Sequence, residues 1–315
     1  MNSEHKGWKD ELQSIIAKHN STRVNGKVAS HKTQADRAAY LFKFFYDLRE
    51  MGYAASPSNS KQKHIQAACE YYESKNLSAA TLQTYLMHLR VYCRWIGKHG
   101  IVGKTAERFS SPEIGKRIYA AQTDKSWSGN GIEVLEKLQE IKSTQPILYM
   151  QLLMEAAFGL RCKETICLRP HIHFDESNLH VVDGAKNGKQ RTIPIETEFQ
   201  KRAMLEAKEF VGRTTNRLIH TGNTLKQEIS LYYRLMGKFG LTKNGLGVTG
   251  HGLRHEFAHA FMESYGLKPP VKGGESGQMN AEAEEQIRLE VSNRLGHNRV
   301  GITAAYYGAF KAKKR

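Results

Sequence analysis

The sequence predicts a mainly α-helical fold with a small antiparallel β-sheet, divided into two domains of about residues 1–125 and 126–315. Three observations predict this class. Helical periodicity runs through almost all of the first half, whereas an alternating pattern is confined to a few short stretches of the second half. The length of 315 residues also exceeds what one hydrophobic core usually serves.

The first half is typical of a compact, basic bundle of four or five helices. Apolar residues at helical spacing predict helices over four segments: residues 8–19, from Thr33 to just before Gly52, 60–74, and 78–96. Thr33 and Asp36 have the spacing of a capping box, and Ser78 directly precedes the longest apolar stripe. We therefore expect helix N-termini at Thr33 and Ser78.

The second half begins after residues 126–130, a polar, turn-forming segment that we interpret as the interdomain linker. A helix is expected over 132–141, and an apolar helix begins in the turn that holds Pro146 and ends at Gly159. Alternation then predicts three short strands, at 171–174, 179–182 and 191–195, with Asn187 and Gly188 as the turn between the last two. Helical patterns return from residue 199.

The charge balance indicates a polyanionic partner. Lys and Arg number 47 against 31 Asp and Glu, a net charge of +16. Residues 1–125 carry +9 of it and residues 126–315 carry +7, so the basic charge is not confined to a tail. Nucleic acid is the polyanion that such a distribution favours.

The composition also excludes several protein classes. No window approaches the roughly 18 consecutive apolar residues of a transmembrane helix, and the first seven residues lack the apolar core of a signal peptide. The four cysteines form no CxxC pair and fit reduced thiols better than disulfides or a zinc site. We therefore expect a cytoplasmic protein with no membrane partner.

Four short segments each place a cation, a proton donor or a nucleophile beside a structural boundary. They are residues 159–164 with Arg161 and Glu164, residues 186–189 with two lysines, residues 251–254 with His251 and Arg254, and residues 295–297 with His297, followed nine residues later by Tyr306 and its neighbour Tyr307. Arginines can clamp the non-bridging oxygens of a phosphate. A tyrosine can form a covalent phosphoester, so the set suits phosphoryl transfer.

In this order and at these distances, the four segments resemble the tyrosine recombinase family of phage and mobile-element integrases. That family's catalytic pattern is Arg, Lys, His-x-x-Arg, His, Tyr. The resemblance assigns it here to Arg161, Lys186, His251, Arg254, His297 and Tyr306. Glu164 takes the place of the supporting acid, Lys186 is preferred to Lys189, and Tyr307 is the alternative nucleophile.

The resemblance implies that DNA strands are cut and rejoined without a metal ion, a nucleotide or another cofactor. Tyr306 would attack the scissile phosphate, leaving a 3′-phosphotyrosyl link and a free 5′-hydroxyl. Lys186 would protonate the leaving oxygen, and His251 would act as general acid and base toward the tyrosine. Arg161 and Arg254 would bind the phosphate, and His297 would add a hydrogen bond.

The resemblance also implies partners and an architecture. Residues 1–125 would form a helical DNA core-binding domain and residues 126–315 the catalytic domain, together a C-shaped clamp on double-stranded DNA. The working unit would be a homotetramer on two DNA sites, with accessory DNA-bending proteins, integrating or excising a mobile element in a bacterial cytoplasm at the nucleoid. Arg90 and Arg94, on the helix 78–96, and Lys189 are candidates for DNA contact.

A zinc hydrolase is a competing interpretation. His255, Glu256 and His259 match the HExxH signature of zinc metalloproteases, and Glu282, Glu284 or Glu285 are the available distant ligands. At 100° per residue, Leu253, Phe257, Ala260 and Phe261 define the buried side of this helix, and the two histidines fall roughly opposite it. A protease also gives no reason for the charge of +16.

Two further alternatives keep DNA as the partner. A type IB topoisomerase uses nearly the same residues to relax DNA without strand exchange. A non-catalytic DNA-binding relative would need neither the nucleophile nor a pair of buried arginines, so the intact set argues against it.

Overall fold

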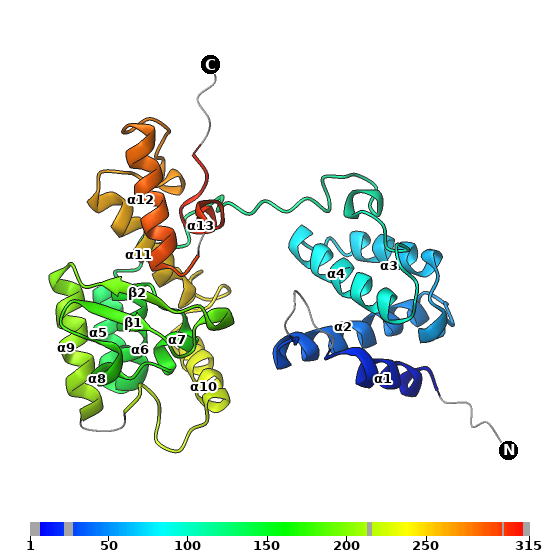
Figure 1. The fold of residues 1–315 in the computed structure, drawn as a ribbon, viewed down its shortest axis with the longest axis horizontal. Helices are drawn as coiled ribbons and strands as arrows, with labels where there is room; N and C mark the ends of the chain where they lie inside the picture. Colours follow the sequence, from blue (N-terminus) through cyan, green and yellow to red (C-terminus); the bar gives the residue numbers. More distant parts are fainter. Residues whose placement is uncertain (1–6, 22–27, 213–215, 298, 311–315) are drawn as a thin grey trace. The chain divides into compact units, whose positions relative to one another are not determined.

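The computed structural model describes residues 7–21, 28–212, 216–297 and 299–310 (Figure 1). The chain divides into two compact units, Met1–Ile118 and Tyr119–Arg315, and each has its own hydrophobic core. The predicted class is confirmed: the described residues are mainly helical, with a single two-stranded antiparallel sheet.

The first unit is built from four α-helices, α1 (Trp8–His19), α2 (His31–Glu50), α3 (Gln62–Ser74) and α4 (Ala79–Trp95). Short 3-10 turns, η1 (Pro57–Asn59) and η2 (Thr105–Glu107), lie in its described connections. Aromatic rings fill the core: Phe45 of α2 meets Phe44 and Tyr92 edge-on, with ring centroids 5.0 and 5.8 Å away. The helical stripes read from the sequence are therefore packing surfaces.

Serine hydroxyls cap two helices of this unit. The Ser78 hydroxyl accepts a hydrogen bond from the Thr81 backbone N–H, which confirms the expected start of α4. The expected cap at Thr33 is wrong, because α2 begins at His31 and its N-cap is Ser30, whose hydroxyl accepts from the Thr33 N–H. Ser30 supplies the side-chain oxygen three residues before an unpaired N–H, which is what an N-cap requires.

The second unit contains nine described α-helices: α5 (Val134–Thr144), α6 (Pro146–Phe158), α7 (Cys162–Ile166), α8 (Pro170–His173), α9 (Glu198–Gly212), α10 (Leu225–Lys238), α11 (His251–Ser264), α12 (Ala281–Arg294) and α13 (Val300–Tyr307). The apolar helix α6 lies inside the core and packs against α5, α7, α9 and α11. Its predicted ends are confirmed, with Pro146 in the first turn and Gly159 as a left-handed C-cap.

Strands β1 (Asn178–Val181) and β2 (Arg191–Pro194) form the sheet, with Asn178 opposite Pro194 and Val181 opposite Arg191. The third strand expected at 171–174 is wrong, because Pro170–His173 is the short helix α8 and only Phe174 makes an isolated bridge to Leu179. Pro170 sets a helical φ at the first position of α8. Four alternating residues are too few to identify a strand.

The segment expected to be the linker lies inside the second unit instead. Trp127 is fully buried, and its Nε1 donates to the Thr249 carbonyl at 2.9 Å. The turn-forming residues around it build the 3-10 turn η3 (Ser128–Asn130), which is tied to α11 through the Ser128 hydroxyl and Glu256 at 2.6 Å. Polar, turn-forming composition does not distinguish a linker from a turn that a buried aromatic ring anchors.

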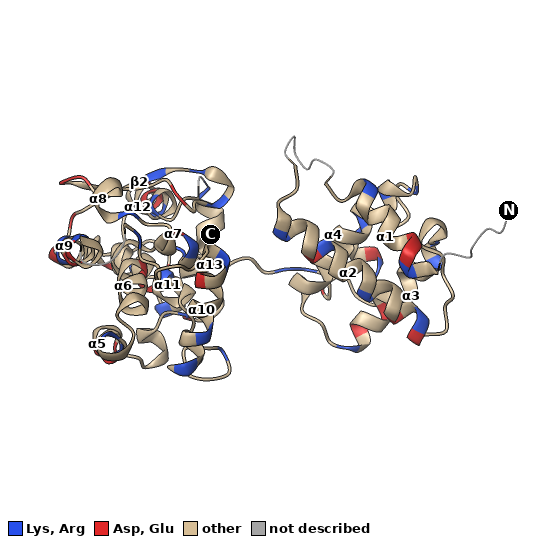
Figure 2. Cartoon of the chain, turned by 90° about the horizontal axis from the view of Figure 1, so that it is seen from below, with Lys and Arg blue, Asp and Glu red and all other residues tan. Residues whose placement is uncertain are grey.

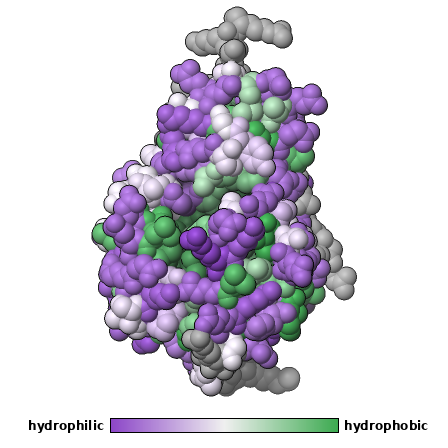
Figure 3. All heavy atoms as spheres, turned by 90° about the vertical axis from the view of Figure 1, so that its left-hand side faces the viewer, coloured by the Kyte–Doolittle hydropathy of each residue, from purple (hydrophilic) through white to green (hydrophobic). Residues whose placement is uncertain are grey.

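Lys and Arg are spread over the helices of both units (Figure 2). The face of the molecule in Figure 3 is mostly hydrophilic, with apolar patches between the polar side chains. Within the described ranges, no helix is both long enough and apolar enough to cross a membrane.

Candidate active site

Side chains from four parts of the second unit meet at one place. The contributing parts are the junction of α6 and α7, the first half of α11, the turn after α12, and α13. They bring together five of the predicted catalytic residues: Arg161, His251, Arg254, His297 and Tyr306. Helix packing, which places α13 against both α11 and α12, is what closes the long gaps in sequence.

The Tyr306 hydroxyl is at the centre of this group. It lies 3.2 Å from Nε2 of His297 and 3.4 Å from Nε of Arg254. Nη2 of Arg161 lies 3.3 Å from the same His297 nitrogen. The tyrosine side chain is buried, with 5% of its surface exposed, so its environment is set by these groups more than by water.

Two backbone carbonyls hold the two guanidinium groups. The Leu295 carbonyl accepts from Nη2 of Arg254 at 2.9 Å and from Nη2 of Arg161 at 3.2 Å, and the Gly159 carbonyl accepts from Nη1 of Arg254. Both carbonyls stand at helix C-termini, α12 and α6, where carbonyls lack intrahelical donors and the helix dipole favours cations. The arginines are thus fixed by the ends of two helices.

Gly159 is required at its position by geometry. Its φ is +59°, and a Cβ built there would lie 2.6 Å from the Phe257 ring. Glycine adopts this backbone conformation without steric cost, and it lets α6 and α11 approach closely. The Gly-Leu-Arg sequence therefore has a structural reason as well as a chemical one.

Glu164 is a buried carboxylate surrounded by arginines. Its oxygens bind Nη1 of Arg161 at 2.7 Å and both terminal nitrogens of Arg191 at 2.8 and 3.0 Å. A third guanidinium, that of Arg254, lies 3.9 Å away. Burial alone would raise the pKa of Glu164, but the hydrogen bonds and charge of Arg191, together with Arg254 and Arg161, hold that pKa at about 2. Glu164 is therefore ionised and balances the arginines.

The two histidines of the group are neutral at physiological pH. Partial burial of its ring lowers the pKa of His297 to about 4, and the charges of nearby cations, led by Arg161 and Arg254, add to this effect. The pKa of His251 is lowered to about 3, first because protein atoms displace water around its ring and then through the charges of Arg254 and its neighbours, although the residue reaches the surface. A neutral imidazole can accept a proton, so His251 can serve as a base.

Tyr307 faces a different environment. It is fully buried, and its hydroxyl accepts a hydrogen bond from Nε of Arg288 at 3.4 Å. Burial raises its pKa, which opposes ionisation. Of the two adjacent tyrosines, Tyr306 is the one whose hydroxyl contacts Arg254 and His297.

Lys186 and Lys189 lie outside this buried group. Both are exposed, in and just after the 3-10 turn η4 (Lys186–Gly188), in which Asn187 has a left-handed φ of 60°. The charge of Lys186 nevertheless contributes to the lowered pKa of His297.

The two candidate DNA contacts of the first unit differ. Arg90 is half-buried and donates to the Gly103 carbonyl at 2.9 Å and to the Thr105 hydroxyl at 3.1 Å, so it fastens the loop after α4. Arg94 is exposed on the same helix. Of the two, Arg94 is the side chain presented to solvent.

The placement that we expected for the HExxH histidines is wrong. His255 and His259 are buried, because α11 is covered by protein on almost all sides, whereas the 100° argument assumed one solvent-facing side. Nδ1 of His255 and Nε2 of His259 both donate to the Tyr306 carbonyl, at 2.9 and 3.0 Å. Glu256 points elsewhere and binds Ser128.

This arrangement is not that of a zinc protease. Such a site needs a nitrogen of each histidine free to bind the same ion. Here one nitrogen of each histidine, Nδ1 of His255 and Nε2 of His259, is used on the Tyr306 carbonyl. In the described part of the chain, no group of three His, Cys, Asp or Glu side chains is arranged to hold a metal ion.

Sequence reasoning missed two residues of the site. Arg191, the first residue of β2, binds Glu164 and also donates to the Arg294 carbonyl at 2.7 Å. Glu155 is buried in α6 beside a cavity of about 380 Å³ that Arg161, His251 and Arg254 also line. It accepts from the Tyr232 hydroxyl at 2.9 Å, and burial raises its pKa to about 8. The one sign of Glu155 in the sequence was a glutamate inside an otherwise very apolar helix.

Two family models match the chain. One, described as phage integrase, N-terminal, matches residues 15–102, and the other, described as integrase, matches residues 118–261. The chain is 28% identical over 198 residues to tyrosine recombinase XerA of Pyrococcus furiosus, covering 60% of this chain and 63% of that protein. It is 27% identical over 235 residues to XerA of Pyrococcus horikoshii, covering 71% of each. The chain thus spans slightly less than two thirds of the first of these relatives.

Solved structures share the fold at low identity. A lambda integrase dimer bound to a COC′ core site matches with a TM-score of 0.61 at 16% identity, over 96% of this chain and 79% of that one. The Tn1549 transposon integrase with transposon right end DNA matches with a TM-score of 0.60 at 16% identity, over 96% of both chains. A lambda integrase tetramer on a Holliday junction matches with a TM-score of 0.61 at 16% identity, over 98% of this chain and 79% of that one.

The two family models match successive parts of the chain, and the clustered residues Arg161 and Arg254 fall within the part that the second model matches. The recombinase relatives and the integrase folds agree with both models. The chain belongs to the tyrosine recombinase family.

Proposed function

We propose that this protein is a site-specific DNA recombinase that cleaves and rejoins strands through a covalent link to Tyr306. One observation carries the proposal. The Tyr306 hydroxyl is within hydrogen-bonding distance of Arg254 and His297, with Arg161 next to them. A phosphate group placed at the hydroxyl would meet two guanidinium groups, which are the strongest phosphate-binding side chains.

The reaction exchanges one phosphodiester linkage for another, so the number of such linkages does not change. The Tyr306 oxygen attacks phosphorus and loses its proton to neutral His251, while the bond from phosphorus to the 5′-oxygen breaks. Lys186 gives a proton to that leaving oxygen, which produces a 5′-hydroxyl and a 3′-phosphotyrosyl link. Attack by a 5′-hydroxyl of the partner strand reverses these steps and releases the tyrosine.

The arginines supply the electrostatic part of catalysis. Negative charge builds up on the non-bridging oxygens in the transition state, and donors already fixed in place stabilise it without further reorganisation. The contacts of Arg161 and Arg254 with helix-terminal carbonyls provide that fixation. His297 adds one hydrogen bond.

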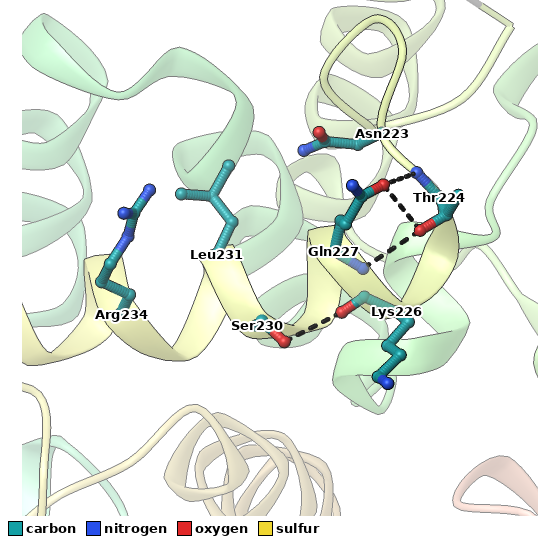
Figure 4. Close-up of a pocket in the computed structure, with 7 residues that line it drawn as sticks. All are labelled: Asn223, Thr224, Lys226, Gln227, Ser230, Leu231 and Arg234. Atoms are coloured by element: carbon teal, nitrogen blue, oxygen red, sulfur yellow. Dashed lines mark hydrogen bonds between the residues drawn. The ribbon is translucent and has the colours of Figure 1, made fainter.

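Double-stranded DNA is the proposed partner. Both halves of the chain have a positive net charge, +9 in residues 1–125 and +7 in residues 126–315, and this favours a polyanionic partner. In the second unit, Lys226 and Arg234 of α10 project beside a cavity of about 650 Å³ that Asn223, Gln227 and Ser230 also line (Figure 4). Cationic side chains of this kind bind phosphates with an affinity that falls steeply with salt.

The finer assignments rest on the family. We propose that the first unit, residues 1–118, is the core-binding domain and the second unit, residues 119–315, the catalytic domain. We also propose that the two close on duplex DNA as a clamp and that a homotetramer performs strand exchange. The lambda integrase tetramer on a Holliday junction supports the last point by analogy of fold. Integration or excision of a mobile element, with accessory DNA-bending proteins, is the proposed setting, and a bacterial cytoplasm the proposed location.

A two-site plasmid assay tests the proposal. The plasmid carries two direct repeats of the DNA that flanks the element in which the gene resides. We expect two smaller circles, one for each part of the plasmid. Relaxed plasmid without recombinants would indicate a topoisomerase instead, and retarded but unchanged plasmid would indicate a DNA-binding protein without catalysis. Either result contradicts the proposal.

A further inference from the structure

The backbone of Tyr306 is held by two histidines that the reaction above does not use. Nδ1 of His255 lies 2.9 Å and Nε2 of His259 lies 3.0 Å from the Tyr306 carbonyl oxygen. A carbonyl only accepts hydrogen bonds, so each ring must donate: His255 from Nδ1 and His259 from Nε2. Both rings are buried, so water does not compete for these bonds.

The position of the carbonyl explains why it is available. Tyr306 is the next-to-last residue of α13, and the last four carbonyls of a helix have no intrahelical donor. α13 has only eight residues, a length at which a helix depends on tertiary contacts. It lies beside α11 (Figures 1 and 2), and the two imidazoles reach across that interface.

One stripe of α11 therefore contacts both ends of the same residue. His251 and Arg254 face the Tyr306 side chain, with a ring-to-ring distance of 5.4 Å and a hydrogen bond of 3.4 Å. His255 and His259, at the following positions on the same face, hold its main chain. Residues three, four and eight positions apart lie on one side of a helix, so a single rigid element sets the whole position of the tyrosine.

The protonation of the two rings suits this task. Burial lowers the pKa of His255 to about 4 and also lowers the pKa of His259. Each neutral ring has one N–H, and the carbonyl takes it. The other nitrogen of His259, Nδ1, lies 3.6 Å from a carboxylate oxygen of Asp124.

We propose that His255 and His259 are positioning residues that clamp the Tyr306 carbonyl and so keep its hydroxyl aligned with the arginines for attack. This inference rests on the recombinase function proposed above. A nucleophile displaced by about 1 Å can lose about 100-fold in rate, so a pair of hydrogen bonds at its main chain has a measurable effect.

Matched substitutions test the clamp. His255→Asn places an amide N–H near the former Nδ1, and His255→Leu removes it at similar size. His259→Gln and His259→Met form the corresponding pair for Nε2. We expect the Leu and Met variants to form the covalent adduct on a nicked suicide duplex about 10- to 100-fold more slowly than the wild type, and the Asn and Gln variants to stay within about threefold.

A second reaction separates positioning from general damage to the site. A DNA strand ending in a 3′-p-nitrophenyl phosphate can be joined to a 5′-hydroxyl strand, because the 5′-oxygen attacks phosphorus and p-nitrophenolate leaves. This joining uses the arginines but not the Tyr306 hydroxyl. We expect the Leu and Met variants to join such strands at close to the wild-type rate.

Glu256→Gln is the control, because Glu256 lies between the two histidines in sequence but binds Ser128. Its adduct formation should match the wild type. Wild-type adduct rates in the Leu and Met variants, or equal losses in cleavage and joining, would overturn the clamp. A wild-type protein that forms no adduct would instead overturn the recombinase function, so the two failures are distinguishable.

Discussion

Two parts of the second unit present the proposed chemistry in opposite ways. We call Arg161, Glu164, Arg254, His297 and Tyr306 the tyrosine cluster, and residues 186–189 the lysine loop. The cluster is interlocked by hydrogen bonds and shielded by the core. The lysine loop is exposed and lies within the nine-residue connection between β1 and β2, and Asn187 in it has a left-handed backbone.

The difference teaches which groups a fold can set in advance. A buried guanidinium needs a counter-charge and fixed acceptors, and Glu164 with two helix-terminal carbonyls provides them. A proton donor for a DNA oxygen only has to reach that atom when DNA is bound. Substitutions in the cluster should therefore impair both stability and catalysis, and substitutions in the loop catalysis alone.

The largest effect is expected from Tyr306→Phe. Loss of the hydroxyl removes the nucleophile, so no covalent DNA adduct should form on a nicked suicide duplex, as read on denaturing gels. Tyr307→Phe is the matched control. It loses only the hydrogen bond from Arg288 and should keep its adduct while losing about 1 kcal/mol of stability. A persistent adduct in Tyr306→Phe would contradict the assignment.

The second-largest effect on cleavage is expected from Arg254→Ala. The guanidinium contacts Tyr306 and two carbonyls, and removal of a preorganised donor typically costs 100- to 1,000-fold in rate, so we expect about 1,000-fold slower cleavage in single-turnover experiments. The melting temperature should fall as well, because Glu164 loses a counter-charge. Unchanged stability would show that the cluster is not interlocked as described.

Glu164→Gln should chiefly reduce stability. Breaking a buried ion pair leaves the arginines uncompensated, at a cost of about 3 kcal/mol in the free energy of unfolding. The folded-state pKa of about 2 lies below the usual 4.5, so this stabilisation is present above pH 4.5 and is lost as the pH falls toward 2. Urea unfolding from pH 6 to pH 3 should show the wild type and the variant converging. A constant difference would contradict the ionised pair.

Lys186→Ala should slow cleavage about 100-fold without changing the melting temperature, since general acids contribute about that much and the side chain is exposed. A substrate with sulfur in place of the 5′-bridging oxygen should restore the rate, because a thiolate leaves without protonation. Lys189→Ala should have a small effect. If Lys189→Ala slowed cleavage more than Lys186→Ala does, Lys189 and not Lys186 would be the proton donor to the leaving oxygen.

The smallest effects are expected in the first unit. Arg94→Ala should weaken DNA binding uniformly across sequences and reduce the slope of log affinity against log salt by about 1, as loss of one phosphate contact does. Arg90→Ala should lower the melting temperature instead, because Arg90 fastens Gly103 and Thr105. Binding titrations at several salt concentrations, together with melting curves, distinguish the two.

Much of the fold was predictable from local signals. Pro146 and Gly159 bound α6 through their own backbone geometry, and Ser78 caps α4 through its hydroxyl, so each signal acts locally. The same reasoning failed where a signal was short or ambiguous. Four alternating residues became α8, and a turn-rich segment was anchored by buried Trp127 instead of linking domains.

The residues of the candidate site that belong to short sequence motifs were predictable. The resemblance to the tyrosine recombinase pattern named Arg161, the His-x-x-Arg pair and Tyr306, which the structure brings together. Arg191 has no such signal, because a single arginine in a short strand gives no sign that it will meet Glu164 in α7. The role of His255 and His259 depends on α13 packing against α11, a contact between residues about fifty positions apart.

The most direct test of the central claim is identification of the residue that carries DNA. The adduct trapped on a suicide duplex is digested with nuclease and protease, and the peptide that retains a nucleotide is sequenced by mass spectrometry. We predict a 3′-linked nucleotide on Tyr306. A nucleotide on Tyr307, on another side chain, or linked through its 5′-phosphate would contradict the account.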